Sequence, residues 1–168
     1  MMLRTPILPI LIAALSLMSA GCGFQLRGSS ASIAQSYSSV RVVDLSGDGR
    51  LRKDLEQALT DTGTNVTATS LNVVEILQSE EDKRTASYSS RGKSAEYELL
   101  KEIRFQFKRD EKVLIPETTF KARRSYLYRE TAAVGKAEEE NMLKRERDQD
   151  LVQHILLSIR RSSQDIDL

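Results

Sequence analysis

The single cysteine has the most distinctive chemical setting in the sequence. Cys22 ends the run Ser19–Cys22, in which small residues close an apolar stretch at 7–20. Small residues directly before a cysteine are typical of a lipoprotein cleavage site, where the thiol accepts diacylglycerol. The pattern therefore predicts a cleaved signal peptide at 1–21 and acylation of Cys22 with diacylglycerol and an N-linked fatty acid such as palmitate. The alternative is an ordinary secretory signal followed by an unrelated cysteine.

The flanks of this segment favour export over membrane spanning. Arg4 supplies a positive start, and the apolar stretch is shorter than the ~20 residues that a spanning helix needs. A cysteine that carries two or more acyl chains stays on a membrane, whereas a single chain binds reversibly. Gly23 follows the cysteine where an aspartate would favour retention at the inner membrane. We therefore expect an outer-membrane anchor.

A few basic residues could recognise an anionic ligand. The chain has 25 basic and 24 acidic residues, so recognition must come from a local cluster. Arg91 and Lys93 flank a predicted hairpin tip, Lys121 and Arg123 share one face of the next strand, and Lys136 precedes the last helix. If these residues converge, their ammonium and guanidinium groups suit phosphate. The alternative is that they are ordinary exposed charges balanced by nearby glutamates.

Sequence features of catalysis are missing. The sequence contains no Gly-x-Gly-x-x-Gly, no phosphate loop and no paired zinc ligands. His154 is the only histidine, and its place in an amphipathic segment predicts a helix-surface residue. We therefore expect a protein that is not an enzyme and that uses no metal or cofactor.

The hydrophobic pattern predicts six elements in the order β-α-β-β-β-α. They are a strand at 40–45, a helix around 51–59 capped by Asp48 and ended by Gly63, strands at 65–78, 84–108 and 113–128, and a helix at 137–161. Between Tyr97 and Lys108 one parity is apolar and the other is polar, as in a sheet covered on one face. The expected fold is α+β: a mostly antiparallel four-stranded sheet with two helices packed on one face.

Three local signals refine the strands. Gly92 can take a positive φ at the tip of a hairpin, and Asp110 with Glu111 makes the next turn. Pro116 argues for an edge strand or a bulge, because proline cannot donate to a sheet ladder. A change of phase near Ser70 predicts a bulge there.

The chain then divides into four parts. The signal peptide at 1–21 is followed by a lipid-anchored flexible tether at 22–39, which is rich in serine and other small residues. A single folded domain is expected at 40–161, and a frayed tail at 162–168.

Several short motifs together resemble the LptE family, the RlpB-like lipopolysaccharide-assembly lipoproteins of the outer membrane. The motifs are Cys22–Gly28, Thr85–Ser87, the glycine-bearing tip Arg91–Lys93, Ala95–Tyr97, Arg124–Tyr126 and Lys136, and the order of elements agrees as well. The resemblance implies a plug subunit within LptD, a large outer-membrane β-barrel. It also implies assistance in barrel assembly and in delivery of lipopolysaccharide to the outer leaflet.

By the same resemblance, the lipopolysaccharide contacts would be basic residues near the hairpin tip and before the last helix, here Arg91, Lys93 and Lys136. Two other readings remain open. One is an accessory scaffold lipoprotein of a different outer-membrane machine, which the identity of a co-purifying barrel would separate. The other is a periplasmic lipoprotein enzyme, which a cavity lined by titratable groups with shifted pKa values would favour.

Overall fold

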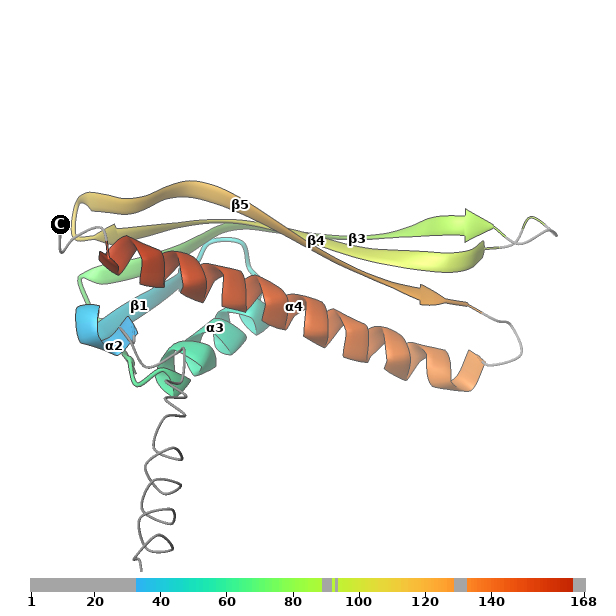
Figure 1. The fold of residues 1–168 in the computed structure, drawn as a ribbon, viewed down its shortest axis with the longest axis horizontal. Coiled ribbons are helices and arrows are strands. Elements are labelled where there is room, and N and C mark those ends of the chain that lie inside the picture. The colour runs from blue at the N-terminus through green and yellow to red at the C-terminus, as the bar shows by residue number, and fades with distance from the viewer. Residues whose placement is uncertain (1–32, 89–91, 93, 129–132, 165–168) are drawn as a thin grey trace, which may run out of the picture. The chain divides into compact units, whose positions relative to one another are not determined.

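A five-stranded mixed sheet forms the framework of the protein (Figure 1). The computed structural model describes residues 33–88, 92, 94–128 and 133–164; the predicted signal peptide and Cys22 lie outside them. The strands follow the spatial order β2-β1-β3-β4-β5. Their bounds are β1 Ser39–Asp44, β2 Asn65–Val66, β3 Asn72–Tyr88, β4 Ser94–Arg109 and β5 Lys112–Leu127.

The sheet differs from the expected antiparallel four-stranded one at its N-terminal edge. β1 pairs in parallel with both β2 and β3, whereas β3, β4 and β5 are antiparallel neighbours. Parallel neighbours need a crossover, and the helix that follows β1 supplies it. The predicted strand at 65–78 is wrong, because the chain leaves the sheet after Val66 and returns at Asn72 as β3, which continues to Tyr88. The predicted strand at 84–108 is wrong as well, because it joins the end of β3 to β4. The bulge lies between Ile76 and Gln78, not near Ser70.

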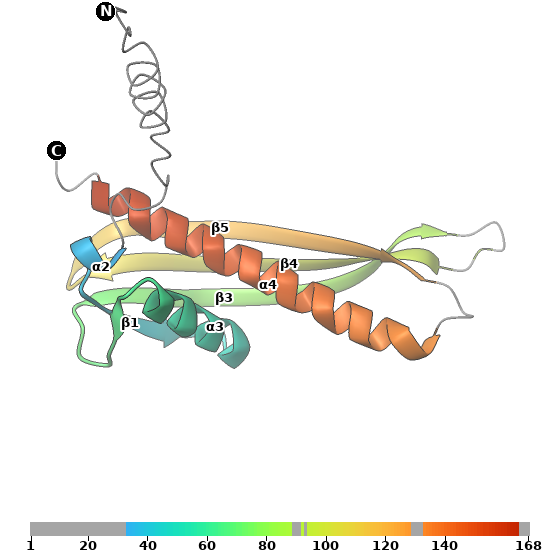
Figure 2. The same cartoon turned by 60° about the horizontal axis from the view of Figure 1, so that its bottom comes forward.

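In the part of the chain that the structure describes, three helices lie against one face of this sheet, one more than expected (Figures 1 and 2). They are α2 Ile33–Ser36, α3 Gly49–Asp61 and α4 Ala133–Gln164. The predicted ends of α3 are confirmed, because the Asp48 Oδ1 accepts from the Leu51 amide at 3.1 Å and Gly63 has a φ of +85°. α4 begins before the predicted 137, so Lys136 lies in its first turn and not in the preceding loop.

The apolar core lies where all three helices meet the sheet. Its fully buried side chains come from α2, β1, α3, the first residues of β3, the second half of β4 and the second half of α4. On α4 the buried apolar residues begin at Leu151 and continue to Ile159. The first half of α4 therefore lies outside this core, against the part of the sheet nearer the β3–β4 tip (Figure 1).

Both predicted boundaries of the folded domain are too narrow. Ile33 and Tyr37, inside the expected tether, are fully buried, because residues four apart share one face of a helical turn. The Tyr37 ring packs edge-on against Phe107 with centroids 4.9 Å apart. The Tyr37 hydroxyl shares a 3.1 Å hydrogen bond with Ser162 Oγ, and α4 continues to Gln164. Residues 33–39 and 162–164 therefore belong to the domain.

The two turns and the edge strand agree with the local signals. Gly92 has a φ of +71° at the β3–β4 tip, and Asp110 has a φ of +53° in the β4–β5 turn. Pro116 lies in β5, which is the last strand of the sheet, next to a register shift between Phe105 and Phe107.

Candidate functional site

The bulge in β3 decides which of its side chains face α4. Beyond the bulge, Ser79, Glu81 and Lys83 pair with Ile103, Lys101 and Leu99 of β4. Contacts from Glu81 to α4 and from Ser79 to Asp48 place this row on the helix-covered face. The helix-covered face of β3 is thus apolar before the bulge and polar after it. We call the part from Ser79 to the tip the distal half of the domain.

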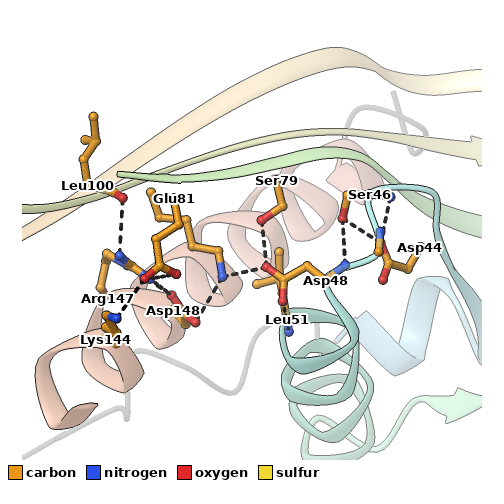
Figure 3. Close-up of polar contacts among 12 residues, drawn as sticks. Asp44, Ser46, Asp48, Leu51, Ser79, Glu81, Leu100, Lys144, Arg147 and Asp148 are labelled. Carbon is orange, nitrogen blue, oxygen red and sulfur yellow. Dashed lines mark hydrogen bonds and ion pairs between the residues drawn. The ribbon is translucent and has the colours of Figure 1, made fainter. Parts of the chain in front are cut away.

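Five charged residues form the centre of an ion network between the sheet and two helices, and Lys144 extends it by pairing with Glu81 at 3.3 Å (Figure 3). The five are Asp48 at the start of α3, Glu81 of β3, Lys101 of β4, and Arg147 and Asp148 of α4. The Lys101 ammonium lies 2.7 Å from Asp48 Oδ2 and 3.1 Å from Asp148 Oδ2. The Arg147 guanidinium donates to Asp148 Oδ1 and Glu81 Oε2, each at 2.9 Å, and to the Leu100 carbonyl at 3.3 Å.

Three of these side chains are almost completely shielded from water. Arg147 is 0%, Asp148 1% and Lys101 3% exposed. Charges removed from water are tolerated only when they are paired and hydrogen-bonded, and here each has at least two partners. Burial alone would raise the pKa of Asp48, but hydrogen bonds from Lys101, Ser79 and the Leu51 amide lower it. The network therefore ties β4, α3 and α4 to one arrangement.

The sequence does indicate this network, although its residues belong to no catalytic or metal-binding motif. The indication is a charged residue at a position where the pattern expects an apolar one. Lys101 interrupts the apolar parity of β4 between Leu99 and Ile103, and the hydrophobic stripe of α4 extended one turn backwards reaches Arg147 and Asp148. A charge on each of two apolar faces indicates a buried ion pair. Only the fold places these two faces together.

A second polar group lies nearer the tip and joins four elements. We call it the distal tyrosine cluster: Tyr97 of β4, Tyr126 of β5, Tyr128 after β5, Lys83 of β3, and Glu140 and Lys136 of α4. The ring of Tyr97 lies 5.7 Å from that of Tyr126 and 5.6 Å from that of Tyr128. The Lys83 ammonium lies 4.7 Å from the centre of the Tyr97 ring, a cation–π distance.

Glu140 is the anion at the centre of this cluster. It accepts from Lys83 Nζ at 2.5 Å and from the Tyr126 hydroxyl at 2.6 Å, and Lys144 pairs with it at 3.1 Å. Partial burial alone would raise the pKa of Glu140, but these hydrogen bonds outweigh it and lower the pKa to about 2. Glu140 is therefore ionised across the neutral range and fixes the two lysines and the tyrosine around it.

A comparison with known protein families now identifies this architecture. The family model LptE, described as lipopolysaccharide-assembly, matches residues 35–159, more than half of the chain. The chain belongs to the LptE family. The match includes the ion network and the distal tyrosine cluster. No curated protein is significantly similar to the chain in sequence.

Solved structures of lipoproteins share the LptE-like fold. A crystal structure of rare lipoprotein B from Shewanella oneidensis has a TM-score of 0.67 at 19% identity, covering 77% of this chain and 99% of that one. A solution structure of an uncharacterized lipoprotein B from Nitrosomonas europaea has a TM-score of 0.64 at 23% identity over 71% and 80% of the two chains. A minor lipoprotein from Acinetobacter baumannii has a TM-score of 0.62 at 22% identity over 74% and 92%.

In this LptE-family chain the three predicted basic residues that the structure describes, Lys121, Arg123 and Lys136, do not form one patch. Lys121 and Arg123 lie on the outer face of β5, where they pair with Glu102 at 2.6 Å and Glu98 at 3.6 Å. Lys136 lies on the helix-covered side, beside Tyr126. Two further candidates, Arg91 and Lys93, lie outside the described residues, as does the lipidation candidate Cys22.

The described part of the chain has neither a metal-binding cluster nor a membrane-spanning helix. In that part, three or more His, Cys, Asp or Glu side chains never gather in a way that could hold a metal ion. Its helices include none that is both long and apolar enough to cross a membrane. His154 is exposed on α4, as expected, with its ring 5.3 Å from that of Phe120.

Proposed function

We propose that this LptE-family protein is a non-catalytic outer-membrane lipoprotein that forms the plug subunit of an LptD–LptE translocon. In this role it assists assembly of the LptD barrel and delivery of lipopolysaccharide to the outer leaflet. The family match over residues 35–159 carries the proposal. The lipoprotein names of the similar structures from Shewanella and Acinetobacter support the lipid anchor.

The charges of the domain suit a plug. The outer face of the sheet carries charges of both signs, which form ion pairs such as Lys108 with Glu75 at 2.8 Å and Arg84 with Glu98 at 2.8 Å. The lumen of a large outer-membrane barrel is polar, so a mixed-charge face is compatible with residence inside it. The same face would be unsuited to contact with lipid chains.

The partner is tested by purification. Protein with a C-terminal tag is captured from detergent-solubilised outer membranes, and the bound proteins are identified by mass. We expect a stoichiometric barrel of the LptD type. A different barrel would replace the proposal by an accessory role in another envelope machine.

The anchor is tested by metabolic labelling with a palmitate analogue. We expect label on the wild-type protein in the outer-membrane fraction and none on Cys22→Ala, which should be released from that membrane. Label on Cys22→Ala would contradict the lipidation site.

Lipopolysaccharide binding is tested by charge reversal of Arg91, Lys93 and Lys136 together. The matched control reverses three exposed basic residues elsewhere, Lys53, Lys112 and Arg161, and so changes the net charge equally. We expect weaker binding of purified lipopolysaccharide only for the first set. A separate pair, Lys121→Glu with Arg123→Glu, tests the outer face, where existing pairs with glutamates should make the loss smaller. Equal affinity in all four proteins would refute the basic contacts.

A further inference from the structure

Lys136 differs from the other basic candidates that the structure describes, because its side chain is mostly shielded and its ammonium group lies beside an aromatic ring. Its Nζ lies 2.5 Å from Glu139 Oε2 and 5.7 Å from the centre of the Tyr126 ring. The Lys136 side chain is 19% exposed, against 60% for Lys121 and 73% for Arg123. A flexible lysine has been given a defined position, with part of its surface open to solvent.

The Tyr126 ring beneath Lys136 is itself fixed from two other elements. Tyr126 is 6% exposed, and its hydroxyl donates to Glu140 Oε2 at 2.6 Å. The same carboxylate oxygen accepts from Lys83 Nζ at 2.5 Å. The Lys83 ammonium also lies 5.7 Å from the centre of the Tyr126 ring. The position of Lys136 on α4 is therefore linked through Tyr126 to β5 and through Glu140 to β3.

We propose that Tyr126, fixed by Glu140 and Lys83, is a positioning residue that holds Lys136 ready for an anionic group of a ligand. The inference rests on the proposed lipopolysaccharide binding, because it names what orients one of the proposed contacts. A lysine restrained before binding loses less side-chain freedom when the ligand arrives. The ligand's phosphate, which carries more negative charge than a carboxylate, replaces Glu139 as the partner of the ammonium group.

The first measurement reads the position of Lys136 without any ligand. The full lipidated protein in detergent is treated with a small amine-acylating reagent, and the rate at Lys136 is followed by peptide mass spectrometry. Lys53, an exposed lysine on α3, is the internal reference. Tyr126→Leu should raise the rate at Lys136 about threefold, the size expected for loss of one cation–π contact at a partly exposed site.

Two further variants separate positioning from simple loss of packing. Tyr126→Phe keeps the ring under Lys136, so it should restore most of the protection that Tyr126→Leu removes. Tyr37→Leu makes the same change in the apolar core, where Tyr37 is fully buried and remote in the sequence from Lys136. It should lower stability and leave the labelling of Lys136 unchanged.

The second measurement couples this position to the ligand. Binding of purified lipopolysaccharide in detergent is compared for the wild type, Tyr126→Leu, Lys136→Ala and the double variant. We expect Tyr126→Leu to weaken binding about threefold, in line with the same lost cation–π contact, and to have no further effect in the Lys136→Ala background. Such non-additivity is the signature of a residue that acts through another.

The outcomes distinguish the inference from the function on which it rests. An unchanged labelling rate in Tyr126→Leu overturns the positioning role, whatever the affinity for lipopolysaccharide. An equal loss of affinity with and without Lys136 also overturns it and leaves the proposed function intact. Failure of the wild type to bind lipopolysaccharide refutes the proposed binding function, and this inference loses its ligand with it.

Discussion

Lys101 carries much of the energetic cost and benefit of the ion network. It is the only cation within 4 Å of Asp48 among the described ion pairs, and it also neutralises Asp148. Removal of one member of a buried pair leaves its partners desolvated and uncompensated, which costs far more than removal of an exposed pair. Any substitution that removes the positive charge of Lys101 should therefore lower the stability of the fold.

Substitution of Lys101 tests this directly. Lys101→Met keeps the length and apolar stem of the side chain but removes the ammonium group. We expect the free energy of unfolding to fall by about 3 kcal/mol, the lower end of the range for a broken buried pair, because Asp48 retains some contact with water. The measurement is urea-induced unfolding followed by circular dichroism.

The matched control is Lys121→Met on the neighbouring strand. Lys121 also pairs with a glutamate, at 2.6 Å from Glu102, but its side chain is 60% exposed. An exposed pair is worth about 0–1 kcal/mol, so the control should change little. Equal losses in the two variants would show that Lys101 is not effectively buried.

Glu140 should make stability depend on pH in the acid range. Its folded-state pKa of about 2 lies below its ordinary value of 4.5, so the carboxylate stabilises the fold above pH about 4.5. This contribution is lost as the pH falls from about 4.5 towards 2. Because solvent screens the cluster, we expect Glu140 to contribute only about 1 kcal/mol to the difference in unfolding free energy between pH 6 and pH 3.

Glu140→Gln should remove this part of the acid dependence and give a flatter profile. Glu138→Gln, a change at a 78% exposed glutamate of the same helix, is the matched control and should follow the wild type. A profile for Glu140→Gln as steep as that of the wild type would refute the assignment to Glu140.

At the scale of elements, the two halves of α4 contact the rest of the domain in different ways. From Leu151 to Ile159 it packs on the apolar core, while from Lys136 to Asp148 it contacts the sheet mainly through charges and a tyrosine hydroxyl. Apolar burial is insensitive to salt, whereas ion pairs at a partly exposed boundary are screened by it. The two halves should therefore differ in local stability.

Hydrogen exchange of the α4 backbone amides tests this difference. We expect the amides at 140–146 to exchange faster than those at 151–157. Salt at ~1 M shortens the Debye length to ~3 Å and should accelerate exchange in the first set only. Uniform exchange along α4, or an equal response to salt in both sets, would show that the ion pairs do not set the stability of its first half.

The elements differ in how far the sequence predicts them. Antiparallel β4 and β5 and most of α4 follow from periodicity, because their apolar residues recur over many positions. α2 does not, because its one buried side chain, Ile33, and the buried Tyr37 that follows the helix lie isolated in a serine-rich stretch. The parallel pairing of β1 is likewise hidden, since strand periodicity does not distinguish the direction of a neighbour.

The candidate site was predicted less completely than the fold, for a physical reason. A charged residue on a polar face and one on an apolar face carry the same charge, so a search for clusters of charge does not separate them. Lys121 follows the polar parity of its strand and is exposed, whereas Lys101 follows the apolar parity and is buried. Strand parity therefore distinguishes these two lysines, although their charge alone does not.

At the scale of the whole molecule, the start of the folded domain matters for the proposed anchor. α2 packs on the core, so the span between Cys22 and the domain ends before Ile33 and not at residue 39. In the proposed lipid-anchored state, fewer residues between Cys22 and the domain give a shorter maximum reach from the membrane, because each residue spans at most about 3.6 Å. The residue at which the domain begins therefore sets how far the domain can lie from the proposed anchor.

Truncation tests where the domain begins. A chain that starts at Val40, the predicted boundary, lacks the buried Ile33 and Tyr37 and the edge-on contact with Phe107. Loss of one aliphatic and one aromatic core side chain should cost about 5 kcal/mol, the sum of the lower ends of the ranges for such losses, because the unfolded chain already buries some apolar surface. A chain that starts at Ala31 keeps both residues and should match the unlipidated full-length domain in its urea midpoint. Equal urea midpoints for the two truncated chains would show that residues 33–39 do not contribute to the stability of the domain. A much lower midpoint for the shorter chain alone would establish that α2 is part of the fold.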